Sequence, residues 1–237
     1  MWKEVDEIIG NDINKFDEKL VGQLRLGDKK AVFRAGKLYE EGLNIKENSE
    51  KAVKLFELCS NEGMSEAKVR LADCYFNGRG INKDNEKAKE LLHEPIKEKN
   101  ISAYMLMGDI YSKELEYKKA VEMYEECNNI YKADKEKMDS YTMAIMYDQM
   151  AEIYLSDNES VRNPESGIKY LDEALKEGVF CNAKLAGDYM FKEKKYDKAR
   201  YYYNIIANER MCDSCPSDCK DYCIQRLNSI EANREFK

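Results

Sequence analysis

Four cysteines near the C-terminus have the spacing of metal ligands. Cys212, Cys215, Cys219 and Cys223 lie within twelve residues, and four thiolates are a common ligand set of structural zinc sites. Two of them could come from a turn and two from one helix, because residues four apart lie on neighbouring turns of the same helical face. Zinc is therefore the one candidate cofactor, and these four cysteines are its candidate ligands.

The same cysteines also have a simpler interpretation as packing residues. Ser217 resembles the N-cap of a final helix, and that helix would place Cys219 and Cys223 on one apolar stripe. Only three residues separate the two pairs of cysteines, which is short for wrapping one ion. On this second interpretation the chain has no cofactor, and both interpretations stay open.

Other residues with the potential for catalysis are few. The only histidine, His93, lies beside Glu94 and Pro95 at an expected helix end, where the helix dipole is a sufficient partner. Every Ser/His/Asp or Cys/His scheme would have to use this residue. Gly78 and Gly80 follow an expected helix and not a strand, so they indicate a left-handed helix end and a turn, not a phosphate loop. We expect a protein without catalytic residues; a subunit of an enzyme complex is an alternative.

Composition excludes several classes of partner. The 237 residues carry a net charge of −7, with Lys and Glu interspersed and no basic stripe, so nucleic acid is not expected as a partner. No apolar run has the length of a signal peptide core or a membrane span. The expected location is therefore the cytoplasm, where the eight cysteines would be thiols or metal ligands.

The elements that position these residues repeat along the chain. A tyrosine is followed thirteen residues later by a small residue in three places, and related tyrosines, here called the landmark tyrosines, are Tyr39, Tyr75, Tyr111, Tyr154 and Tyr189. Three residues before each is a small residue, which lets a second helix approach closely. The first two copies are 36 residues apart, and this period is typical of stacked helix pairs. We expect an all-α superhelical solenoid of about five helix-turn-helix repeats with capping helices.

The motif resembles a known repeat family. Leu71-Ala72-x2-Tyr75-x2-Gly78-x-Gly80, followed by Lys87-Ala88, is similar to the Sel-one-like repeat, as are the unit around Tyr39 and the unit at 146–178. The third unit has only nine residues from Tyr111 to Ala120, the spacing of a tetratricopeptide repeat. The resemblance covers about residues 28–211. It implies an alpha/alpha superhelix that holds proteins together.

One repeat domain accounts for the whole chain. Residues 1–27 are expected to form an N-terminal capping helix, 28–211 the five repeats, and 212–237 a cysteine-containing turn and a C-terminal capping helix. Eleven extra residues near 128–139 are about three helical turns, so helices could lengthen there without rotating their buried faces. This insertion is either tolerated at the surface or a ridge that contacts a partner.

The resemblance also implies a binding surface. In tetratricopeptide-type arrays the first helix of each pair lines a concave groove, whose apolar side chains can anchor a peptide or helix while polar ones set its register. The corresponding positions here are Phe33, Lys37, Val69, Asp73, Phe76, Asn77, Met105, Asp109, Asp148, Glu152, Leu155, Met190 and Phe191. The sequence thus predicts a non-catalytic scaffold or adaptor; a metal-stabilised regulatory module using the C-terminal cysteines is the alternative. Phe76, Leu155 and Phe191 could instead pack between repeats.

Overall fold

The computed structural model describes residues 2–179, 181–208 and 219–235, and within these ranges every regular element is a helix. This confirms the all-α prediction. The chain divides into two compact units, residues 1–115 and 116–237. The boundary falls inside the third predicted repeat, between its two helices. One continuous repeat domain over 1–237 stays a prediction.

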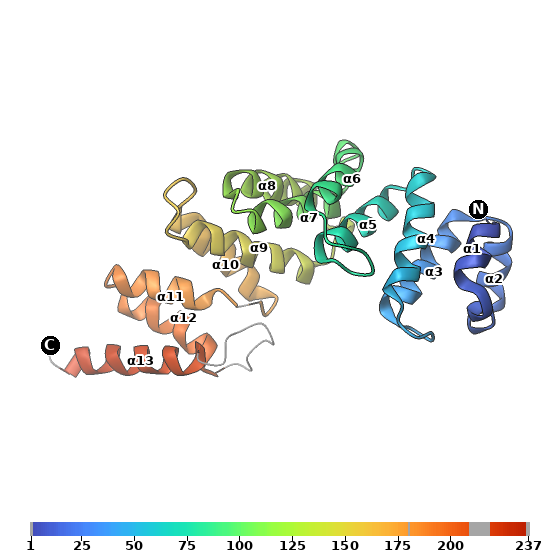
Figure 1. Cartoon of the computed structure of the whole chain (residues 1–237). Helices are drawn as coiled ribbons and strands as arrows, with labels where there is room; N and C mark the ends of the chain where they lie inside the picture. Colours follow the sequence, from blue (N-terminus) through green and yellow to red (C-terminus); the bar gives the residue numbers. More distant parts are fainter. Residues whose placement is uncertain (1, 180, 209–218, 236–237) are drawn as a thin grey trace. The chain divides into compact units, whose positions relative to one another are not determined.

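The first unit consists of short N-terminal helices followed by helix pairs. Its elements are α1 (Trp2–Ile9), the 3-10 helix η1 (Gly10–Lys15), α2 (Glu18–Arg25), α3 (Lys29–Glu41), α4 (Ser49–Asn61), α5 (Ser65–Asn77), α6 (Asn85–Lys97) and α7 (Ile101–Lys113). Helix α3 pairs with α4 and α5 with α6, and α4 packs on α5 (Figure 1). These hairpins are the first two predicted repeats.

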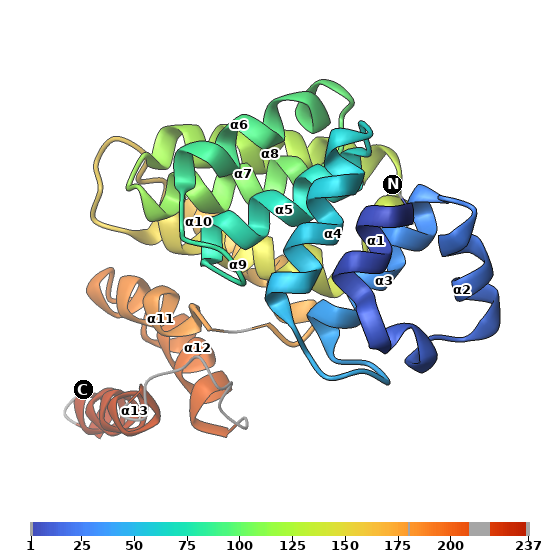
Figure 2. The ribbon, with the colours of Figure 1, turned by 45° about the vertical axis from the view of Figure 1, so that its right-hand side comes forward.

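The second unit repeats this arrangement and ends on a single helix. Its elements are α8 (Tyr117–Ala133), the 3-10 helix η2 (Lys135–Lys137), α9 (Ser140–Leu155), α10 (Pro164–Lys176), α11 (Ala183–Lys192), α12 (Tyr196–Asn208) and α13 (Cys219–Glu235). Helix α9 pairs with α10 and α11 with α12, and α13 packs on α12 (orange and red in Figure 2). Helices α8 and α9 have 17 and 16 residues, against 13 in α3 to α7. The insertion therefore lengthens both helices that flank it, as predicted.

In three repeats, the carbonyl of the landmark tyrosine accepts a common backbone hydrogen bond. In three repeats the residue nine positions after the tyrosine caps the second helix of the pair: its side chain accepts a backbone N–H of the first turn. Its own N–H donates to the tyrosine carbonyl at 2.9 to 3.0 Å, in Asn48 to Tyr39, Asp84 to Tyr75 and Asn163 to Tyr154. This bond closes the turn between the two helices, because it satisfies a carbonyl at the end of the first helix.

The small position before the landmark tyrosine has the predicted role. A Cβ placed on Gly36 would lie 2.6 Å from the ring of Phe56 on the paired helix α4. No side chain larger than hydrogen fits there without displacing the ring. The close approach of α3 and α4 therefore requires glycine at this position.

The N-terminal cap differs from the prediction of one helix. Gly10, with φ of 54°, follows α1, and Asp17 begins α2 by accepting the Leu20 N–H at 2.7 Å. The left-handed glycine and the new N-cap divide the cap into α1, η1 and α2. Val5, Ile9, Leu20 and Leu24 are buried, and α1 contacts α4 while α2 contacts α3.

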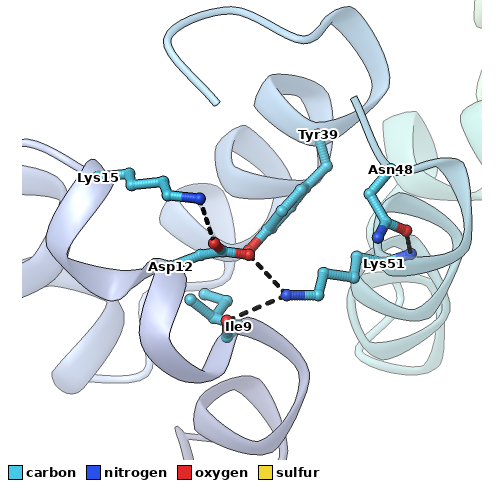
Figure 3. A network of polar contacts seen from close by, with 6 residues as sticks. All are labelled: Ile9, Asp12, Lys15, Tyr39, Asn48 and Lys51. Carbon is cyan, nitrogen blue, oxygen red and sulfur yellow. Dashed lines mark hydrogen bonds and ion pairs between the residues drawn. The ribbon is translucent and has the colours of Figure 1, made fainter. Parts of the chain in front are cut away.

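A polar network attaches this cap to the first repeat (Figure 3). Asp12 Oδ2 accepts from the Tyr39 hydroxyl at 2.9 Å and from Lys51 Nζ at 2.6 Å, and Oδ1 accepts from Lys15 at 2.7 Å. Lys51 also donates to the Ile9 carbonyl at 3.1 Å. The hydrogen bonds from Lys15 and Lys51 hold the pKa of Asp12 well below its usual range. The landmark tyrosine of repeat one is thus also a contact of the cap.

Candidate protein-interaction surfaces

In the first unit, most of the predicted partner contacts reach the surface but Phe76 does not. Those exposed or partly exposed are Phe33, Lys37, Val69, Asp73, Asn77, Met105 and Asp109. Phe76 is only 8% exposed, and the Lys83 ammonium lies 5.3 Å from its ring centre. Phe76 therefore belongs to the packing of the repeat. Partner binding by the other residues stays a prediction.

Asp73 and Asn77 belong to a charged cluster between α3 and α5. Asn77 Nδ2 donates to Asp73 Oδ1 at 2.6 Å, and Arg79 forms an ion pair with Asp73. Arg70 and Arg79 each lie 3.7 Å from a carboxylate oxygen of Glu40. The cluster holds equal numbers of acidic and basic groups, so its charges are largely paired with one another.

Asp148 on α9 is buried, although it was predicted to face a partner. It is 5% exposed. Asn182 donates to it three times: its N–H to Oδ1 at 3.1 Å, and its Nδ2 to Oδ2 at 2.8 Å and to the carbonyl at 3.1 Å. Burial raises the pKa of Asp148 to about 6, against the opposing effect of the Asn182 bonds. Asp148 therefore joins α9 to the start of α11.

This raised pKa predicts a pH-dependent stability of the second unit. The folded protein binds the Asp148 proton more tightly than the unfolded chain does. The resulting stabilisation is complete below the ordinary pKa and is lost as pH rises through about 6. When the pH is lowered from about 7.5 to about 5, the free energy of unfolding of the wild type should rise by about 1.4 kcal/mol relative to that of the Asp148→Asn variant. Urea unfolding of both proteins measures this; a pH-independent difference would contradict it.

Helix α9 nevertheless exposes two large apolar side chains that sequence analysis did not single out. Tyr141 is 58% and Ile145 36% exposed, and Glu152, a predicted contact, is also exposed. With 100° per residue these three lie within about 40° of one another on the helical wheel. They are called the α9 stripe below. The repeat pattern assigns no position to the lengthened start of α9, so it did not mark Tyr141 or Ile145.

The remaining predicted contacts of the second unit take part in packing. Leu155 lies against Gly167 of α10, where an added Cβ would be 2.8 Å from Leu155 Cγ. Met190 is 5% exposed. The Phe191 ring lies 4.7 Å from the Arg226 guanidinium of α13 and edge-on to Tyr196 at 5.5 Å. These contacts agree with the alternative that Leu155 and Phe191 pack within and between the helix pairs.

The candidate zinc ligands are only partly described. Cys212 and Cys215 lie outside the described residues. Cys219 and Cys223 are buried on α13, and burial, followed by the neighbouring Cys219, raises the pKa of the Cys223 thiol to about 12. In the part of the chain that the structure describes, no three His, Cys, Asp or Glu side chains converge where a metal ion could bind. Zinc binding by the four cysteines stays a prediction, and the described pair fits packing better than ligation.

We expect the purified protein to hold less than about 0.1 zinc per chain, because Cys219 and Cys223 are buried in the packing of α13. Elemental analysis of protein prepared without chelator measures this content. Cys219→Ser/Cys223→Ser is the matched control. About one zinc per chain in the wild type, lost in this variant, would instead establish the four-cysteine site.

A groove of about 660 Å³ lies between α10 and α12, the second helices of their pairs. Its floor consists of apolar groups from three helices: Ile168, Leu175, Met190 and Tyr202. Its rim carries four charged side chains, Asp172, Lys176, Asp197 and Lys198. The Tyr202 hydroxyl donates to Asp172 at 2.9 Å and bridges the two helices. The repeat pattern assigns partner contacts to first helices, so of the groove residues it predicted only Met190 of α11.

Stacked antiparallel helix pairs with surface patches on their exposed faces define an α-helical repeat protein. The chain belongs to the Sel1 repeat family, whose repeat matches residues 29–64, 65–94, 148–179 and 183–209, more than half of the chain. This confirms the resemblance found in the sequence. Residues 95–147, which include the unit with tetratricopeptide spacing, are not matched. Sel1 repeats generally mediate protein interactions.

Solved structures share the fold. A Sel1 repeat protein from Oxalobacter formigenes has a TM-score of 0.60 at 16% identity, over 97% of this chain and 99% of that one. A protective antigen of uropathogenic Escherichia coli strains, displaying an SLR fold, has a TM-score of 0.57 at 21% identity. The match covers 76% of this chain and only 38% of the antigen. No curated protein matches the chain. None of the described helices is long and apolar enough to span a membrane.

Proposed function

We propose that the chain is a non-catalytic adaptor that binds a peptide or helix of a partner protein on the α9 stripe of Tyr141, Ile145 and Glu152. The observation that carries this proposal is the pair of exposed apolar side chains, Tyr141 and Ile145, one turn apart on the first helix of a repeat. They share a helical face with Glu152, a position that the repeat pattern predicted for a partner, whereas Asp148 on that face is covered by Asn182.

The chemistry of the stripe indicates the kind of segment that fits. A buried large apolar side chain contributes about 1.5 to 3 kcal/mol, so Tyr141 and Ile145 are suitable anchors for apolar residues of the partner. Glu152, further along the same face, favours a Lys or Arg in the partner and sets its direction. The partner segment is therefore amphipathic, with an apolar side and a basic residue beyond it.

A displayed peptide library tests this function. Peptides selected on the wild-type protein should bind Tyr141→Ser or Ile145→Ser at least about tenfold more weakly, as expected when an apolar anchor is removed. Leu26→Ser is the control, because Leu26 is 87% exposed but lies between α2 and α3 in the first unit. Fluorescence anisotropy measures the affinities. Equal affinities for the wild type and the three variants would show that the α9 stripe does not bind the peptides.

Several further features support an adaptor over other functions. The net charge of −7 disfavours nucleic acid, and a single histidine leaves general acid-base chemistry few candidates. The proposed location is the cytoplasm, where a chain with eight cysteines keeps them reduced. The proposed partner is therefore a protein, with neither nucleic acid nor a membrane as the target.

A further inference from the structure

The groove between α10 and α12 has an exposed aromatic side chain beside it. Tyr201 lines the groove and is 57% exposed, with its ring edge-on to the Tyr202 ring at 5.1 Å. Met190 and Leu175 lie in the same groove. One face of the second unit thus carries both a projecting apolar ring and a hollow with an apolar floor.

The charges on the rim decide which kind of partner fits. Asp172 and Asp197 are acidic, and Lys176 and Lys198 are basic, so the rim has no net charge. A uniformly acidic or basic partner would gain no net electrostatic attraction from such a rim. A second copy of the same face carries both signs in the same places and can complement itself when rotated by 180°.

We propose that the chain forms a two-fold symmetric dimer through this face, with Tyr201 of each copy in the groove of the other. The ring would cover Leu175, which is the partly exposed apolar residue of the groove floor next to the buried Met190. In an isologous contact each copy supplies one ring and one groove, so both contacts form together. This inference is independent of the proposed adaptor function.

The size of the face predicts a weak dimer. Helices α10 and α12 each have 13 residues, so each is about 20 Å long and about 10 Å wide. Such a face offers roughly 400 Å² per copy, below the roughly 800 Å² per partner of stable complexes. The dimer should therefore dissociate in the micromolar range or above. No residue of α9 lines the groove, so dimerisation would leave two α9 stripes available and make the adaptor bivalent.

Analytical ultracentrifugation of the full chain from about 5 to about 500 µM tests the dimer, because this range brackets a weak association. The weight-average mass of the wild type should rise with concentration towards twice 27.7 kDa. Tyr201→Ser should stay monomeric. Tyr141→Ser is the matched control, since Tyr141 is exposed to the same degree, and it should dimerise like the wild type. Circular dichroism of the variants checks that helix content is unchanged.

Mixing two variants tests the symmetry of the contact. Leu175→Arg should block the groove but leave the Tyr201 ring, while Tyr201→Ser removes the ring but leaves the groove. Neither variant should associate alone, and an equal mixture should recover one of the two contacts and form a heterodimer. No recovery in the mixture would overturn the two-fold arrangement.

Two results would overturn the proposal as a whole. One is a wild-type mass that stays at the monomer value over the full concentration range. The other is a Tyr201→Ser protein that associates as the wild type does. If the wild type is monomeric and Tyr201→Ser loses affinity for peptides selected as described above, the groove binds a partner protein and not a second copy.

Discussion

Replacing Gly80 with alanine is expected to lower the free energy of unfolding of the first unit by about 3 kcal/mol or more. Gly80 has a φ of 70°, in the left-handed region, as expected from the turn after α5. A Cβ there would lie 2.3 Å from the Ser49 carbonyl carbon and oxygen. These are backbone atoms at the start of α4, and they cannot rotate away. The loop of repeat two must therefore separate from repeat one to accept the methyl group.

Gly63→Ala is the matched control for this substitution. Gly63 has a φ of 76° but no atom within 4 Å of an added Cβ. Alanine there meets only the backbone strain, about 1 kcal/mol. Hydrogen exchange of α4 and α5 amides with urea unfolding measures both losses. Equal losses would mean that the loop shifts without cost and that the contact between Gly80 and Ser49 does not hold the two repeats together.

Asp188→Ala is expected to have the second-largest effect, about 3 kcal/mol, by detaching α13 from the last helix pair. Asp188 Oδ1 accepts hydrogen bonds from Tyr203 of α12 and Tyr222 of α13, both at 2.7 Å. Tyr203 is completely buried, and its hydroxyl would lose its acceptor. Burial, followed by the bond to Asp188, raises the pKa of Tyr203, so the hydroxyl stays a donor at neutral pH.

The Asp188→Asn variant distinguishes the stability contributed by the hydrogen bonds from the stability contributed by packing of the side chain. Asparagine keeps an oxygen at the accepting position, and we expect it to lose less than half as much stability as alanine. Hydrogen exchange over Cys219–Glu235, compared with exchange over α8, shows whether α13 opens by itself. Equal effects of the two substitutions would assign the loss to packing and not to the paired tyrosine hydroxyls.

Much of the fold could be predicted because its determinants are local. The residue nine positions after a landmark tyrosine caps the next helix, and small residues such as Gly36 meet a ring on the paired helix. Both devices act within one hairpin, so they leave a regular period in the sequence. The N-terminal cap has no such period. Its division at Gly10 and Asp17 was therefore missed.

The surface was harder to predict, because periodicity gives the direction of a side chain but not what covers it. Asp148 lies on the predicted face of α9, yet Asn182, 34 residues later, covers it. Phe191 contacts Tyr196 at the start of its paired helix, but it also meets Arg226 of α13. Tyr141 and Ile145 were overlooked because the repeat pattern assigns no position to the lengthened start of α9.

The amino-acid sequence alone determined the helical class, the places of the hairpins and the family, because these depend on residues fewer than about 40 positions apart that recur with a fixed period. Tertiary structure alone decided which apolar side chains stay exposed. Burial depends on neighbours from other repeats and from the capping helix, whose approach no single repeat encodes. The α9 stripe and the groove between α10 and α12 are visible only after the helices have packed.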